Sequence, residues 1–126
     1  MGGESAVTAL VGAFRDPDPE IRRRAASALG DIGEAAVPSL IGALASDEAD
    51  LRREAVAAFG LMGRLAVGPL MATLGSGDRR ARAGAAAALG EIGDPRSVDA
   101  LIAALQDDQK EVREAARQAL GSIRKT

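Results

Sequence analysis

Histidine, cysteine, tryptophan and tyrosine are absent from this 126-residue sequence, and phenylalanine occurs only twice. Without an imidazole, a thiol or a phenol, the chain lacks the groups that most often act as a base or nucleophile near neutral pH. The lack of cysteine excludes disulfides and thiolate metal sites, and the carboxylates show no spacing typical of a cation loop. The composition therefore predicts a protein that is not an enzyme, with no cofactor and no metal site.

The sequence also lacks an apolar run long enough to cross a bilayer, a leader segment, a Pro- or Ser-rich linker and runs of β-branched residues. Charged residues make up 27% of the chain, but they nearly balance, with a net charge of −2. We therefore expect one all-helical domain over residues 1–126, located in the cytoplasm and without membrane contact.

The chain contains a repeat with a period of 30–31 residues. The segment Ile21–Gly30 has an apolar residue, an arginine, an alanine-rich stretch and a final Leu-Gly, and it returns at residues 51–60, 81–90 and 112–121. A second element with apolar residues at i, i+3, i+4 and i+7 recurs at residues 6–14, 37–44, 67–74 and 98–105. A period of this size indicates a solenoid of about four antiparallel helix pairs, with copies near residues 4–33, 34–63, 64–93 and 94–126.

Local signals mark the expected helix ends and core. Acidic and small polar residues precede each arginine-bearing helix, as N-caps require, and the second glycine of Leu29–Gly33 lies where a helix end favours a left-handed residue. The inward stripe of the first arginine-bearing helix is expected to contain Ile21, Ala25, Ala28, Leu29 and Ile32.

An acidic loop, an apolar residue, Arg, an alanine-rich helix and Leu-Gly-x-Ile-Gly together resemble the short HEAT-like repeats first described in phycobilin lyases. The resemblance extends from about residue 6 to residue 123. It implies a right-handed α-solenoid, with the arginine-bearing helices on the convex side and the Val-x-x-Leu helices on the concave side. It also implies a scaffold that binds a protein. A phycobilin-lyase-type chaperone subunit is the alternative, although the aromatic and His contacts expected around a tetrapyrrole are missing. Whether the chain is a piece of a longer array or an engineered repeat protein stays open.

The most regular polar feature is a column of four arginines: Arg22, Arg52, Arg82 and Arg113. We expect it to be structural, with each arginine bridging to loop acids such as Asp16, Asp18, Asp47, Asp78 or Asp108. The rival interpretation is a ladder for phosphates, since some HEAT-like folds act on DNA. The negative net charge and the lack of aromatics for base stacking make nucleic acid the weaker hypothesis.

The second helices carry an unusual ridge opposite their apolar stripe. It consists only of small, uncharged residues: Ala9, Gly12, Ser39, Gly42, Pro69, Ala72, Ala100 and Ala103. One interpretation is a partner-binding groove on the concave side that lets another backbone approach closely. The other is tight curvature that leaves no room for larger side chains.

The two ends of the array are expected to differ. Arg117 replaces the small residues Ala26, Val56 and Ala86 of the earlier copies, which predicts an exposed, polar capping repeat at the C-terminal end. The first helix, in contrast, lacks an arginine-bearing helix before it and has an interior-like pattern. We therefore expect an exposed apolar end there, covered in a two-fold homodimer through Val7 and Val11.

Overall fold

The computed structural model describes residues 2–124, with the side chains of residues 5–123. Eight α-helices lie in this part of the chain, and it contains no strand: α1 Gly2–Gly12, α2 Pro19–Ile32, α3 Val37–Leu44, α4 Ala49–Met62, α5 Val67–Thr73, α6 Arg79–Ile92, α7 Val98–Ala104 and α8 Lys110–Arg124. Short 3₁₀ segments at 13–15, 33–36, 63–66 and 95–97 connect some of them.

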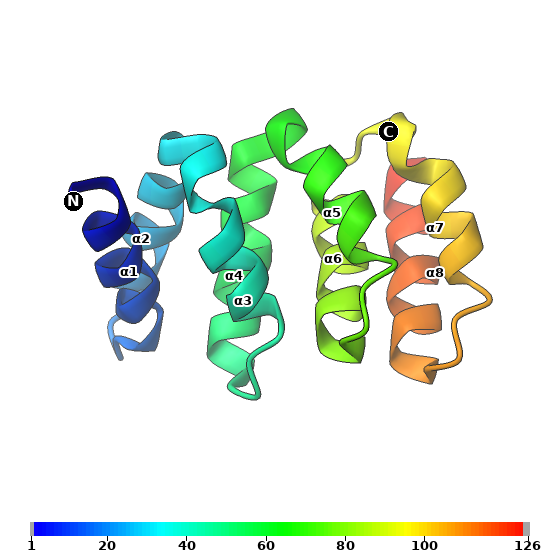
Figure 1. Ribbon diagram of the computed structural model, residues 1–126, viewed down its shortest axis with the longest axis horizontal. Helices are drawn as coiled ribbons and strands as arrows, with labels where there is room; N and C mark the ends of the chain where they lie inside the picture. Colours follow the sequence, from blue (N-terminus) through cyan, green and yellow to red (C-terminus); the bar gives the residue numbers. More distant parts are fainter. Residues whose placement is uncertain (1, 125–126) are drawn as a thin grey trace.

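The helices form four antiparallel pairs in a row (Figure 1). Each short helix packs on the longer helix that follows it, so the pairs are α1–α2, α3–α4, α5–α6 and α7–α8. The all-helical, right-handed solenoid expected from the sequence is confirmed. Among the described residues no arginine-bearing helix precedes α1, and α1 packs on α2, the arginine-bearing helix that follows it.

The two layers of the solenoid have different spacing. The long helices α2, α4, α6 and α8 contact one another along the whole array, whereas α3, α5 and α7 make far fewer direct contacts with each other. In a stack that bends, the more closely spaced layer lies on the inner side. This closer spacing indicates that the arginine-bearing helices form the inner, concave layer, the reverse of the expected assignment of the two sides.

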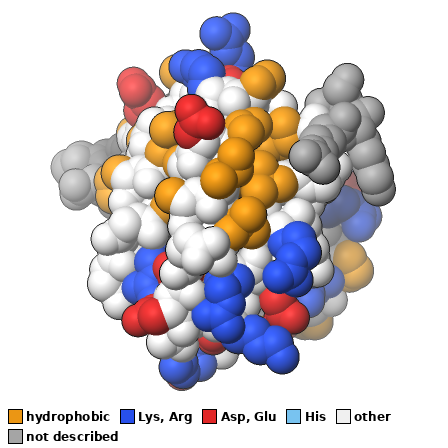
Figure 2. Space-filling view, turned by 90° about the vertical axis from the view of Figure 1, so that its right-hand side faces the viewer, with side chains coloured by type: hydrophobic (Ala, Val, Ile, Leu, Met, Phe, Trp, Pro, Cys, Tyr) orange, Lys and Arg blue, Asp and Glu red, His pale blue; other side chains and the backbone are white. Residues whose placement is uncertain are grey.

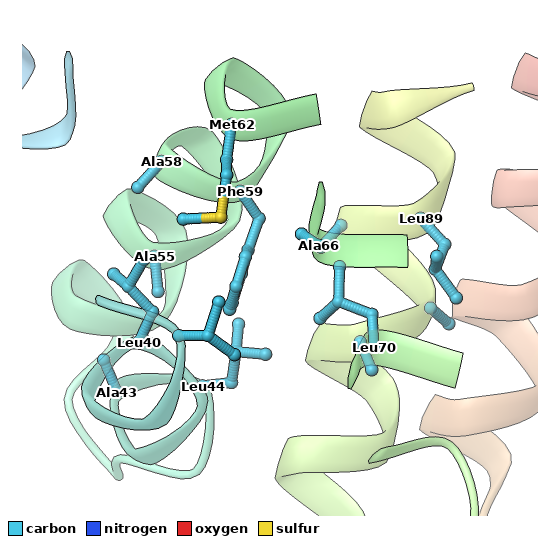
Figure 3. Packing of buried hydrophobic residues seen from close by; sticks show 14 of the residues in the cluster. Leu40, Ala43, Leu44, Ala55, Ala58, Phe59, Met62, Ala66, Leu70 and Leu89 are labelled. Atoms are coloured by element: carbon cyan, nitrogen blue, oxygen red, sulfur yellow. The ribbon is translucent and has the colours of Figure 1, made fainter. Parts of the chain in front are cut away.

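The core lies between the two layers. Phe14, Phe59, Leu40 and Leu70 are fully buried, and Figure 3 shows Phe59 reaching from α4 toward Leu44 of α3. Alanines fill the closest contacts, so the helices can approach one another without large side chains between them. Two residues expected in this core are instead exposed at the first pair: Ile21 is 41% exposed and Ile32 is 38% exposed.

Two of the arginine-bearing helices, α2 and α6, begin with the expected side-chain cap, whereas Glu48 at the start of α4 makes none. The Asp18 carboxylate caps α2 by accepting from the Glu20 N–H at 2.9 Å, and the Asp78 carboxylate caps α6 by accepting from the Arg80 and Ala81 N–H groups. Gly33, Gly63 and Gly93 all have positive φ angles, between 74° and 79°. Only Gly93 has the expected left-handed conformation, because ψ is −135° at Gly33 and −137° at Gly63, which suits glycine alone.

One stretch, residues 49–73, is long and apolar enough by composition to cross a membrane. It is not one straight helix, because α4 ends at Met62 and a 3₁₀ turn beginning at Gly63 separates it from α5. Its apolar residues supply part of the core, including Phe59 and Leu70. Burial between the two layers accounts for the apolar character of this stretch.

Candidate functional site: two faces and two ends

The arginine column fixes the geometry of the loops. In every copy the Nη1 group donates to the backbone carbonyl oxygen six residues earlier, at 2.7–2.9 Å. The four pairs are Arg22 with Asp16, Arg52 with Ser46, Arg82 with Ser76, and Arg113 with Asp107. The column therefore acts on the loop before its own helix, which favours the structural interpretation over a phosphate ladder.

Among the described residues, two of these arginines have carboxylate partners. The Arg82 Nε and Nη2 groups bind both carboxylate oxygens of Asp107 at 2.9 and 3.1 Å, and Arg22 lies 3.4 Å from Glu54. Burial, the largest single effect, raises the pKa of Asp107, but the hydrogen bonds from Arg82 and the Gln109 N–H and the charge of Arg82 together outweigh it and hold this pKa below its ordinary value. Both acids belong to the following helix pair, so these ion pairs join neighbouring repeats. Of the acids expected as partners, only the Asp108 carboxylate binds a column arginine among the described residues, Arg82 at 3.3 Å. The pairs with Asp107 and Glu54 and the carbonyl acceptors were missed.

The ridge of small residues lies on the outer layer. Ala9, Gly12, Ser39, Gly42, Ala72 and Ala103 are exposed, and Pro69 and Ala100 are half-buried. A Cβ built on Gly12 or Gly42 would meet no atom within 4 Å. Crowding therefore does not explain why glycine stands at these two positions, which counts against the interpretation by tight curvature. The ridge also lies on the more widely spaced side of the array and not on the expected concave side.

The inner face carries the residues that differ most between copies. On successive turns the outward positions are Arg23, Ser27 and Asp31 on α2, Arg53, Ala57 and Leu61 on α4, Ala83, Ala87 and Glu91 on α6, and Glu114, Gln118 and Ser122 on α8. All of them are exposed except Ala83 and Ala87, which are half-buried. Most of these side chains face solvent, so packing leaves them free to differ between copies.

Leu61 is the most conspicuous residue of this face, with 63% of its surface exposed. It lies in a shallow groove with Ala26, Ala57 and Gly60, and charged side chains, among them Arg23 and Glu91, lie at the rim. Sequence reasoning missed Leu61, although a signal was present: the same position holds Asp31, Glu91 and Ser122 in the other copies.

The exposed arginines of this face are already paired with acids. Arg23 and Arg24 both bind Glu20, at 2.7 and 3.1 Å, and their hydrogen bonds lower the pKa of that carboxyl. Arg53 binds Asp50 within the same helix. Each pair lies three or four residues apart, so the charges balance locally instead of forming a continuous basic stripe.

The C-terminal end differs from the expected polar cap. Arg117 is exposed as predicted, Ala26 and Ala86 are buried, and Val56 is half-buried. The surface around Arg117 is nevertheless an apolar hollow between α7 and α8, visible as the orange patch in Figure 2. It is lined by Val98, Ile102, Leu105, Leu120, Gly121 and Ile123.

The N-terminal end also needs a correction. Val7 is only 3% exposed and belongs to the core of the chain, and Val11 is half-buried, so Val7 is not at a surface that a second chain can reach. The exposed apolar residues of the first pair are Ile21 and Ile32, on α2. Apolar residues are thus exposed at both ends of the array. At the N-terminal end the exposed residues are Ile21 and Ile32, and not Val7 and Val11, which were expected to form the self-association surface.

The described residues contain no cluster of three metal-ligating side chains. The acids whose pKa is lowered are held by arginines: the pKa of Asp94 falls to about 2 because the Arg96 side chain and backbone N–H both donate to it. Such a carboxylate stays ionised and is a poor proton donor at neutral pH.

Comparison with known proteins identifies the repeat. The family model described as HEAT repeats matches residues 1–60 and 37–121. No curated protein sequence matches. Among solved structures, human deoxyhypusine hydroxylase in complex with glycerol superposes with a TM-score of 0.64 at 32% identity, over 95% of this chain and 44% of that one. The chain thus spans less than half the length of the hydroxylase.

A second solved structure gives the same architecture. The CpcE–CpcF complex of phycocyanin lyase from Nostoc sp. PCC7120 superposes with a TM-score of 0.60 at 21% identity, over 97% of this chain and 80% of that one. This likeness shows a shared fold. The period, the paired helices, the arginine column and the matching family model lead to one conclusion: the chain belongs to the HEAT-repeat family.

Proposed function

We propose that this HEAT-repeat scaffold is non-catalytic and binds a protein segment along its inner face, with the groove around Leu61 as the anchor. The observation that carries the proposal is the exposed Leu61 side chain, which stands at a position that is polar in the other copies. An exposed apolar patch rimmed by polar residues is typical of a surface that binds another protein.

The distribution of charge indicates the chemistry of the partner. At one level of the inner face, Arg23 and Arg53 lie on the N-terminal half of the array and Glu114 on the C-terminal half, with Ala83 between them. Because Arg23 and Arg53 are already paired with acids of their own helices, we expect the partner segment to be apolar at the Leu61 groove and polar, without strong net charge, on either side of it. The inner side of a solenoid offers an extended surface of this kind.

The other candidate functions have less support. A nucleic-acid ligand needs unpaired basic groups, whereas Arg23, Arg24 and Arg53 each lie against an acid of their own helix. A pigment-handling role like that of the phycocyanin lyase rests on the shared fold alone, and the inner face has no aromatic side chain for stacking on a tetrapyrrole. A cytoplasmic location stays a prediction.

Two single variants test which face binds. Leu61→Asp places a charge in the inner groove, and Gly42→Arg places one on the outer ridge, where a new Cβ meets no atom within 4 Å. Both positions are exposed, so each variant should keep its stability within about 1 kcal/mol, as measured by urea unfolding. The tagged proteins are then used to capture partners from the native host, and the bound proteins are identified by mass spectrometry.

We expect Gly42→Arg to retain the proteins that the unmodified chain captures and Leu61→Asp to lose them. The reverse pattern would move the binding site to the outer ridge. Retention by both variants would remove both faces as candidates. Because the chain contains no cysteine, Ala57→Cys provides a unique attachment point for a photocrosslinker, which should label the same partner in the intact protein.

A further inference from the structure

The interfaces between neighbouring helix pairs share a glycine seat. A Cβ built on Gly30 would lie 3.1 Å from Leu61 Cβ, and one built on Gly60 would lie 3.3 Å from Glu91 Cβ. At Gly90 the built Cβ would lie 2.9 Å from both Cα and Cβ of Ala119. In each case the glycine provides the space into which the long helix of the next pair packs.

The C-terminal end presents the same seat without an occupant. Gly121 corresponds to Gly90, yet a Cβ built on it would meet no atom within 4 Å among the described residues. The seat adjoins the apolar hollow between α7 and α8, where Ile102 is 50% exposed (Figure 2). A glycine inside a helix costs up to about 1 kcal/mol of stability relative to alanine. In the interior copies this glycine makes room for the long helix of the next pair.

The N-terminal end presents the stripe that fits such a seat. In α4, Leu51, Ala58 and Met62 form the stripe that packs on the preceding pair, and all three are buried. The corresponding residues of α2 are Ile21, Ala28 and Ile32, which are exposed, half-buried and exposed. The same pattern of side chains is therefore covered inside the array and open at this end.

Charged groups at the two ends continue the interior pattern as well. Inside the array, Asp107 accepts the Gln109 N–H with one carboxylate oxygen and binds Arg82 of the preceding pair. Asp16 is the equivalent residue of the first pair. It accepts the Asp18 N–H at 2.8 Å in the same way, but no cation pairs with its carboxylate among the described residues.

Arg113 is the matching cation at the other end. It is the counterpart of Arg82, its Nη1 donates to its own loop, and the described residues give it no carboxylate partner. One end of the chain thus has an acid arranged like Asp107, and the other has an arginine arranged like Arg82.

From these observations we propose that the C-terminal end of one chain binds the N-terminal end of a second copy, head to tail. The α2 stripe Ile21, Ala28 and Ile32 of the second copy packs on the Gly121 seat of the first, and Arg113 binds Asp16 across the junction. Arg117, which replaces an alanine or valine of the interior interfaces, makes this junction weaker than those inside the array. Such a contact does not close on itself, so it forms open rows that lengthen with concentration.

The first test uses the 126-residue chain in sedimentation velocity experiments over a range of concentrations. We expect the average mass to rise steadily with concentration. Gly121→Leu should fill the seat and weaken the association by more than about tenfold. The same variant should raise the stability of the monomer, because leucine favours a helix more than glycine does. Gly42→Leu is the matched control: it is also an open helical glycine, and it should gain stability while still forming rows.

Two further variants probe the junction in opposite directions. Arg117→Ala restores the small residue of the interior copies and should strengthen association. Asp16→Asn keeps the acceptor for the Asp18 N–H but removes the charge that faces Arg113, so it should weaken association and reduce its salt dependence.

Mixing distinguishes head-to-tail stacking from a two-fold dimer. Ile32→Lys blocks only the N-terminal end, and Gly121→Leu blocks only the C-terminal end, so each variant alone should be monomeric. Their equimolar mixture should give a 1:1 complex that does not grow further, because the complex joins the only two open ends and leaves both blocked ends outside. A monomeric unmodified chain at high concentration overturns the proposal. Association that survives Gly121→Leu, or two monomeric variants that do not combine, does the same.

Discussion

Adding one methyl group at Gly90 should destabilise the protein, although alanine favours a helix more than glycine does. The new Cβ would lie 2.9 Å from Cα and Cβ of Ala119, whereas carbon atoms attract best at roughly 3.5–4.0 Å. Because the Ala119 Cα belongs to the backbone, relief requires α6 and α8 to move apart by roughly 0.6–1 Å. Overpacking of this kind costs about 1–3 kcal/mol, against a helix-propensity gain of about 1 kcal/mol.

The same substitution at Gly121 should have the opposite sign, since its Cβ enters open space. We expect Gly121→Ala to stabilise by about 0.5–1 kcal/mol and Gly90→Ala to destabilise by about 0.5–2 kcal/mol. Gly60→Ala should fall between them, because its neighbour at 3.3 Å is the Cβ of the exposed Glu91. This order follows the contact distances, not the helix propensity, which is the same at all three positions.

Urea unfolding at 25 °C, followed by circular dichroism on dilute protein, measures the series. The slopes m should agree among the variants, so that midpoints report stability. If Gly90→Ala were as stable as the unmodified protein, the close approach of α6 and α8 would not be a constraint. If Gly121→Ala were as destabilised as Gly90→Ala, the glycines would be needed for the helices themselves and not for the seats.

Three further predictions follow from local geometry. Gly63→Asn should cost about 1–3 kcal/mol of stability, since φ 74° with ψ −137° suits only glycine. Gly93→Asn should cost less than about 1 kcal/mol, because φ 74° with ψ 18° is a conformation that asparagine also adopts. Equal losses in urea unfolding would contradict this difference. Arg52→Met should cost about 1–2 kcal/mol by losing its charge-assisted bond to a loop carbonyl, and a loss within error would make the column dispensable. Because Arg96 lowers the pKa of Asp94 to about 2, this carboxylate stabilises the fold above its unfolded pKa, and the stability gap to Asp94→Asn should close as the pH falls from 3.8 toward about 2; a gap independent of pH in acid unfolding would refute this.

The chain also shows how far its candidate surfaces could be predicted from the sequence. The exposed ridge and the exposure of Arg117 follow from helical periodicity, which states which side of a helix is apolar. Leu61 could have been found by comparing copies, because an apolar residue stands there in a column that is otherwise polar. The carbonyl acceptors of the arginine column could not, since they depend on the path of a loop and not on a side-chain type.

The sequence by itself determined the period, the eight helices, their capping residues and the glycines with positive φ, because these features arise from contacts within about one repeat. Only the tertiary structure decided which layer is inner, since curvature depends on the distances at which whole helices pack, as at Gly90 and Ala119. It also decided that Val7 is buried while Ile21 and Ile32 are exposed. An apolar stripe in the sequence indicates that one face of a helix can be buried. Whether that face is buried depends on whether another helix packs over it, which the tertiary structure decides.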